Sequence, residues 1–160
     1  MSAALKLIED HSQKVFEKKL AHLQLASNLQ QKILIVDDDI DMANAIKILV
    51  ESFSRNFSCE VVNDPYEALL TMSDKSFDMV LVDQKIPGLE GSVILSKIDE
   101  FVDKDPLIIE SGRYANLIPA VIMSASEVKL ADNFKLKNFV IEKVLNKNDL
   151  PQFLSERFIN

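Results

Sequence analysis

The sequence predicts an α/β fold in which a five-stranded parallel sheet is covered by helices on both faces. Short runs of consecutive apolar residues alternate with segments whose apolar residues recur at helical spacing. The apolar runs lack the alternation of apolar and polar residues that half-exposed strands show, which is typical of strands buried on both faces. Of the 160 residues, 48% are hydrophobic and 27% are charged, a composition that supports one well-packed core.

The predicted elements alternate along the chain, as they do in a doubly wound sheet. The strands are expected at residues 33–36, 59–62, 79–82, 120–123 and 139–141. The helices between and after them are expected at residues 40–53, 65–72, 90–102 and 148–158. Asn63 and Asp64 precede Pro65, a pattern that favours a helix start with proline in the first turn.

Residues 3–30 contain neither glycine nor proline and predict a separate amphipathic helix. Its apolar stripe consists of Leu5, Ile8, Val15, Phe16, Leu23 and Ala26. We therefore divide the chain into an N-terminal helix, residues 1–31, and an α/β domain, residues 32–160. An apolar stripe needs a partner, so we expect this helix either to fold back onto its own domain or to form a homodimer through residues 3–30. A membrane-surface role is a weaker alternative, because Glu9, Asp10 and Glu17 dilute the basic charge that such helices use.

Charge and composition exclude several classes of function. The formal charge is −7 and basic residues do not cluster, which argues against nucleic-acid binding. The apolar runs are too short for a membrane span, and the N-terminus lacks the pattern of a secretory signal. The single cysteine, Cys59, cannot form an intrachain disulfide, which suits a reducing, cytoplasmic location.

Three carboxylates are expected at the carboxyl edge of the sheet. Asp37 and Asp38 follow the first strand, and Asp83 ends the third. These strands are neighbours in the flavodoxin-like order 2-1-3-4-5, and ligands of such sheets bind at this edge. Crowded carboxylates repel one another unless a cation neutralises them, and oxygen ligands suit Mg²⁺. The alternative is that Asp37, Asp38 and Asp39 are ordinary N-cap and first-turn acids of the next helix.

Two further side chains complete the candidate site. Ser124 follows the fourth strand and offers a hydroxyl, and Lys143 is expected just after the fifth strand and offers an ammonium group. A nucleophilic carboxylate, a cation, a hydroxyl and a lysine are the components that phosphoryl transfer requires.

These segments resemble the receiver domains of response regulators over about residues 32–159. Residues 32–39, Lys-Ile-Leu-Ile-Val-Asp-Asp-Asp, look like the opening of that family, and residues 83–91, Asp-Gln-Lys-Ile-Pro-Gly-Leu-Glu-Gly, resemble its phosphoacceptor strand and loop. Ser124-Ala125 matches its hydroxyl residue and the small residue that follows, and Lys143 is taken as its lysine.

The resemblance implies a phosphorylation switch and not an enzyme acting on other substrates. Asp83 would accept a phosphoryl group from a histidine kinase or a histidine phosphotransfer protein. Asp37, Asp38, Asp83 and the backbone carbonyl of Lys85 would hold Mg²⁺. Ser124 would hydrogen-bond the phosphoryl group and Lys143 would pair with it. Because only the last helix is expected after Lys143, the protein would be a stand-alone regulator that signals through protein contacts.

The chain also departs from the family pattern. The connection between Asp83 and Ser124 is long, which indicates an insertion around residues 105–118. The stretch from Ser124 to Lys143 leaves room for a short fourth helix at best, and Val140 stands where relatives carry a switching aromatic residue. These departures favour an alternative, a receiver-like scaffold or dimerisation module that no longer responds to phosphate. A Mg²⁺-dependent phosphohydrolase ranks last, because Lys85 stands where such enzymes place a second acid.

Overall fold

The computed structural model describes residues 13–14, 17 and 29–159, so most of the predicted N-terminal helix lies outside the described residues. Residues 31–160 form a compact unit, which we describe by itself. Its strands are β1 (Gln31–Val36), β2 (Phe57–Val62), β3 (Met79–Asp83), β4 (Ile118–Ser124) and β5 (Phe139–Asn146). Its helices are α2 (Ile40–Phe53), α3 (Pro65–Asp74), α4 (Gly91–Val102), α5 (Pro106–Ser111) and α6 (Leu150–Ile159), and residues Lys147–Asp149 form a 3-10 turn.

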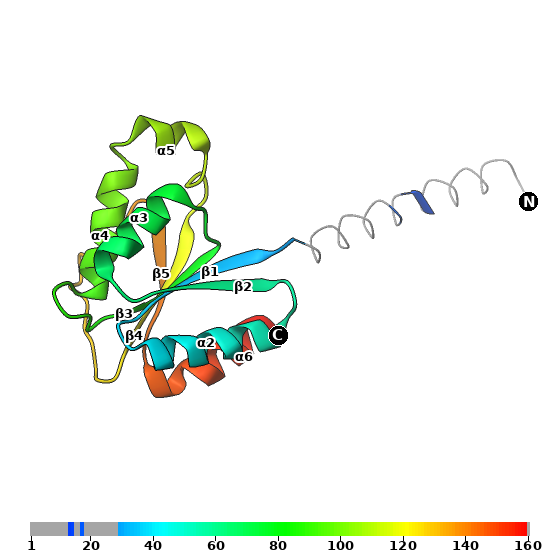
Figure 1. The fold of residues 1–160 in the computed structure, drawn as a ribbon. Coiled ribbons are helices and arrows are strands. Elements are labelled where there is room, and N and C mark those ends of the chain that lie inside the picture. The colour runs from blue at the N-terminus through cyan, green and yellow to red at the C-terminus, as the bar shows by residue number, and fades with distance from the viewer. Residues whose placement is uncertain (1–12, 15–16, 18–28, 160) are drawn as a thin grey trace, which may run out of the picture. The chain divides into compact units, whose positions relative to one another are not determined.

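All five strands are parallel and lie in the order β2-β1-β3-β4-β5, so the predicted class and strand order are confirmed. Helices α2 and α6 cover one face of the sheet, and α3 and α4 cover the other (Figure 1). Successive residues of a strand point to opposite faces, so each strand supplies both cores. In β1, Leu34 and Val36 pack under α3 and α4, while Ile33 and Ile35 pack under α2 and α6.

Local sequence explains where the helices begin. Asp39 caps α2, and its side chain accepts a hydrogen bond from the backbone N–H of Met42 at 3.0 Å. Asp64 caps α3 through the N–H groups of Tyr66 and Glu67, with Pro65 in the first turn as predicted. Each cap satisfies N–H groups that have no partner within the helix. The caps also place the strand-to-helix turns at the edge where β1, β3 and β4 end.

The fifth strand is longer than predicted, because it continues past residue 141 to Asn146. Its pairing with β4 is irregular between Ala120 and Val121, so that Ile141 faces Ala120 and Lys143 faces Val121. Glu142 is therefore the extra residue of a bulge. The polar pair Glu142-Lys143 ended the apolar run on which the shorter prediction rested.

The two long connections around β4 also differ from a regular repeat. The expected insertion contains the short helix α5, which Asp105 caps by accepting from the N–H of Leu107. Residues 125–138, which connect β4 to β5, contain no helix, so even the short fourth helix that we allowed for is absent from this described segment. None of these residues is buried, although Leu130 and Leu136 rest partly on the core under α3 and α4.

Candidate functional site

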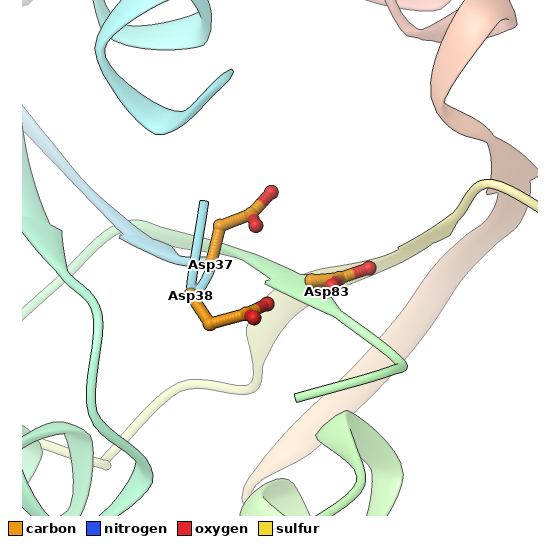
Figure 2. Close-up of side chains that lie close together, drawn as sticks. All are labelled: Asp37, Asp38 and Asp83. Carbon is orange, nitrogen blue, oxygen red and sulfur yellow. The ribbon is translucent and has the colours of Figure 1, made fainter. Parts of the chain in front are cut away.

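The three predicted carboxylates meet at the carboxyl edge of the sheet. Asp37 and Asp38 follow β1, Asp83 ends the adjacent strand β3, and Figure 2 shows their carboxylates turned toward a common space. One oxygen from each lies within 4.8 Å of the others. Asp37 and Asp83 are buried and Asp38 is exposed, so the cluster is open to solvent on one side.

The cap geometry separates these acids from Asp39. Asp39 is the N-cap residue of α2, whereas Asp37 and Asp38 precede the cap. Asp37 Oδ1 accepts a hydrogen bond from the N–H of Asp39 at 3.0 Å, and its other oxygen faces the cluster. The alternative of ordinary helix-capping acids therefore holds for Asp39 alone.

A lysine that the sequence analysis did not select lies in this cluster. The ammonium of Lys147 donates to Asp37 Oδ2 at 2.7 Å and lies 3.4 Å from Asp83 Oδ1, with only 14% of its side chain exposed. Lys147 reaches this place because β5 runs to Asn146 and the 3-10 turn starts directly after it.

Lys143 does not lie where we expected it. It is exposed in the middle of β5, where it pairs with Val121, and it is not at the end of the strand. The strand ends at Asn146 and not at residue 141, so the lysine that directly follows it is Lys147, four positions after Lys143. The apolar pair Val144-Leu145 before Asn146 was the available signal that the strand continues.

Burial raises the pKa of Asp83 above its usual value, and the charge of Asp37 adds to the rise. The ammonium of Lys147 and the backbone N–H of Lys85 oppose it. Burial alone would lower the pKa of Lys147, but its hydrogen bond to Asp37 and the charges of both carboxylates raise it overall. Lys147 therefore stays positively charged and offsets part of the repulsion between the two buried acids.

Ser124 ends β4, one residue beyond Met123, which pairs with Asp83. It is buried, and its Oγ accepts a hydrogen bond from the N–H of Ser126 at 3.3 Å. Next to it, the side chain of Asn146 donates to the carbonyl of Ala125 at 3.3 Å, which joins the ends of β4 and β5. The strand ends thus bring a hydroxyl to the same edge as the acids and the lysine.

A family model described as response regulator receiver domain matches residues 33–149. The chain belongs to this family. The resemblance inferred from the sequence motifs is therefore confirmed.

Curated proteins that this receiver domain resembles are much longer than it. Transcription factor SKN7 of Saccharomyces cerevisiae is 32% identical over 87 residues, which is 52% of this chain and 13% of SKN7. SKN7 of Candida albicans is 27% identical over 130 residues, 80% of this chain and 21% of that protein. The DNA-binding response regulator MtrA of Mycobacterium tuberculosis is 33% identical over 63 residues, 39% of this chain and 27% of MtrA.

Solved structures agree with this fold. A CheY-like receiver domain protein from Methanospirillum hungatei superposes with a TM-score of 0.58 at 20% identity, covering 81% of this chain and 94% of that one. The receiver domain of the putative regulator NarL from Mycobacterium tuberculosis gives 0.57 at 15% identity, covering 82% and 94%. At these identities the comparison supports the fold alone.

The receiver's phosphoacceptor strand is joined tightly to α4. A Cβ atom on Gly91 would lie 2.3 Å from the carbonyl oxygen of Asp83, so only glycine fits this approach. The buried side chain of Gln84 accepts from the N–H of Ser92 at 2.9 Å and donates to Ser92 Oγ and to Glu90. Gln84 and Gly91 belong to the family motif at residues 83–91, but the motif alone predicts no role for either. In the structure they hold the start of α4 against the residue after Asp83.

The receiver's donor set fits a hard divalent cation. Asp37, Asp38 and Asp83 supply oxygens close enough to share one ion, and the exposed side at Asp38 leaves room for water ligands. Two buried carboxylates with one lysine leave an excess of negative charge, which a cation would neutralise.

Among the helices that the structure describes, none is long and apolar enough to cross a bilayer.

Proposed function

We propose that this receiver domain accepts a phosphoryl group on Asp83, in a reaction that requires Mg²⁺. The observation that carries the proposal is the group of Asp37, Asp38 and Asp83 at one sheet edge, with Lys147 bonded to two of them. The donor would be a phosphohistidine on a sensor histidine kinase or a phosphotransfer protein, because those are the donors that the family uses. The domain would act in the cytoplasm, without binding nucleic acid itself, and would signal through protein contacts.

In the proposed transfer, an oxygen of Asp83 attacks the phosphorus of the phosphohistidine. A P–O bond forms, the P–N bond breaks, and the leaving imidazole retains the bonding electrons and takes up a proton. The attacking carboxylate must be ionised, and Lys147 favours that state against the effect of burial. The transferred group would lie near Ser124, whose hydroxyl would donate to it, and near Lys147, whose ammonium would pair with it.

Asp37, Asp38, Asp83 and the backbone carbonyl of Lys85 are the groups proposed to hold Mg²⁺. The ion would neutralise charge on the phosphoryl oxygens during transfer. Asp38 is the exposed member of the set and faces solvent, from which the ion would enter. We assign the lysine role to Lys147 instead of Lys143, since Lys143 lies in the middle of β5 and is exposed.

A second function is favoured by one observation. Residues 125–138 contain no helix, and in receivers a helix of this connection contributes to the surface that partners read. Without this helix, the domain would bind its partners in the same way whether or not it carries a phosphoryl group. Under that alternative the acids would remain as structural ligands of a cation or of Lys147 alone.

The test is to incubate the protein with Mg²⁺ and acetyl phosphate and to record its intact mass. We expect a gain of one phosphoryl group in the unaltered protein and none in the Asp83→Asn variant or with a chelator present. If no phosphoryl group is gained either from acetyl phosphate or from a phosphohistidine donor, although Mg²⁺ binding is detected by calorimetry, the scaffold function is supported. Absence of Mg²⁺ binding would contradict the proposed cation site itself.

A further inference from the structure

The outer face formed by α3 and α4 carries exposed apolar side chains. On α3, Tyr66 and Leu70 are each 69% exposed, and on α4 Phe101 is 48% exposed. Leu70 and Phe101 line a groove of about 430 Å³ between the two helices, together with Leu69, Ser73, Lys97, Glu100 and Lys104. An exposed apolar groove of this kind indicates a surface that a partner covers.

Charges on this face are divided between the two helices. Glu67 and Asp74 are exposed on α3, and Lys97 is exposed on α4 with Lys104 just beyond its end. In the described part of the chain, Glu67, Asp74 and Lys97 form no ion pair within the fold. Lys104 lies 4.0 Å from Glu100, and both side chains are more than 70% exposed. The charges on this face are thus mainly acidic on α3 and mainly basic on α4, with Glu100 of α4 offsetting part of the charge of Lys104.

Such a face is complementary to itself under a two-fold rotation. Helices α3 and α4 both run antiparallel to the strands, so they are parallel to each other. If the two-fold axis runs parallel to the helices, α3 of one copy lies on α4 of the other, and acidic residues face basic ones. If it runs across them, α3 faces α3 and like charges meet. Closed two-fold contacts use the same patch on both partners, and opposite charges favour the first arrangement.

We infer that the face of α3 and α4 is a contact between two copies of this chain, related by a two-fold axis parallel to these helices. Leu70 and Phe101 form its apolar centre, because both line the same groove. Glu67 and Asp74 of one copy pair with Lys97 and Lys104 of the other. Glu67 and Asp74 are seven positions apart in the sequence, and so are Lys97 and Lys104, so the two pairs of charges have matching spacing.

The insertion supports this face from its end. Arg113 donates to the carbonyl of Asp74, and the hydroxyl of Tyr114 donates to the carbonyl of Met72 at 2.7 Å. Both carbonyls belong to the last turn of α3, which would otherwise leave them without intrahelical partners. The end of α3 is therefore fixed in place before any partner binds, which lowers the entropy lost on association.

The test uses two charge-reversed forms of the full chain, followed by analytical ultracentrifugation. The variant Lys97→Glu with Lys104→Glu makes both helices acidic on this face, and Glu67→Lys with Asp74→Lys makes the face mainly basic, with Glu100 as its remaining acid. We expect the unaltered protein to dimerise, and each variant alone to have a dimer Kd raised at least about tenfold. An equimolar mixture of the two variants should form heterodimers, because opposite charges face each other again.

The control is Lys129→Glu with Lys135→Glu, which changes net charge equally at exposed positions outside this face. It should leave the dimer intact, and circular dichroism should show that all variants fold. A protein that stays monomeric at millimolar concentration would overturn the inference. A dimer that persists in both charge-reversed variants would also overturn it, and would point to another contact such as residues 3–30.

Discussion

The ammonium of Lys147 lies 3.4 Å from a carboxylate oxygen of Asp83, although Lys147 comes from the turn after the last strand. The same ammonium also donates to Asp37, so one cation contacts both buried acids of the site. The lysine is therefore part of the balance of charge around Asp83 before any ligand arrives.

Replacing Lys147 by alanine is expected to impair the site. Asp37 is fully buried and would lose its hydrogen-bonded partner, so the free energy of unfolding without Mg²⁺ should fall by about 1–3 kcal/mol. Phosphorylation by acetyl phosphate should slow about tenfold or more. The matched control is Lys143→Ala, an exposed position whose loss should change stability by less than about 0.5 kcal/mol. Equal effects of both variants on phosphorylation would contradict the assignment.

Gly91→Ala should damage the joint between Asp83 and α4. The added methyl group would meet the Asp83 carbonyl at 2.3 Å, so the helix must shift, at a cost of about 2 kcal/mol or more. Gly112→Ala is the comparison, because its Cβ meets nothing within 4 Å and only its φ of +68° is unfavourable, costing about 1 kcal/mol. Urea denaturation measures both. If Gly91→Ala lowers the free energy of unfolding less than Gly112→Ala does, the close approach of Gly91 to the Asp83 carbonyl does not constrain the fold.

Asp99→Ala should loosen the connection before β5. Asp99 is buried on α4 and accepts from the N–H groups of Lys137 and Asn138 and from the side chain of Asn138. Loss of these bonds should lower the free energy of unfolding by about 2–4 kcal/mol. Hydrogen exchange should also become faster in residues 137–138.

The control for Asp99 is Asp103→Ala. Asp103 forms an ion pair with the exposed side chain of Lys137 and accepts from the Asn138 side chain, but no backbone N–H depends on it. We expect the smaller loss of stability there. A larger loss in Asp103→Ala than in Asp99→Ala would show that the ion pair, and not the buried carboxylate, holds this connection.

Cys59 should reduce stability at high pH. Burial raises the pKa of its thiol to about 12, whereas an unfolded cysteine has a pKa of about 8.5. As pH rises above 8.5 the unfolded chain loses the proton and the folded one keeps it, so folding becomes less favourable. The loss should reach about 2 kcal/mol at pH 10.

The comparison for Cys59 is Cys59→Ala, since other groups also titrate at high pH. The difference in unfolding free energy between the unaltered protein and Cys59→Ala should change by about 2 kcal/mol from pH 7 to pH 10. A difference that stays constant over this range would mean that the thiol ionises in the folded protein.

The sheet and its acids could be predicted from the sequence because their signals are local. Continuous apolar runs marked the strands, and a carboxylate directly after a run, as at Asp37 and Asp83, places it at the edge of a parallel sheet. The strand order then brought residues from distant parts of the sequence together. For residues 105–118 and 125–138 the spacing between motifs predicted an insertion and a shortened connection, but the conformation of the two loops had no comparable local signal.

Lys147 was missed because the apolar run of β5 is interrupted. Glu142 and Lys143 lie at a bulge, where the ladder with β4 shifts by one residue, and a polar pair at this point reads as the end of a strand. The shift depends on pairing with β4, a contact that periodicity within β5 does not contain. The end of the connection in residues 125–138 also depends on a contact distant in sequence, because Asp99 on α4 accepts from the backbone N–H groups of Lys137 and Asn138.

The α5 insertion lies near the amino ends of the strands, whereas the acids lie at the carboxyl ends. Helix α4 starts beside Asp83 and carries the chain back from one end to the other (Figure 1). Arg113 and Tyr114 attach it to the end of α3, Tyr114 also packs against Phe139 of β5, and none of these contacts involves a residue of the site. Change in this segment during evolution is therefore expected to alter which molecules the domain recognises while the chemistry at Asp83 is preserved. For protein engineering, the same separation makes the exposed positions of α5, such as Leu107 and Ile109, suitable places to introduce new binding residues, whereas Ile108 is buried in the core and should be kept.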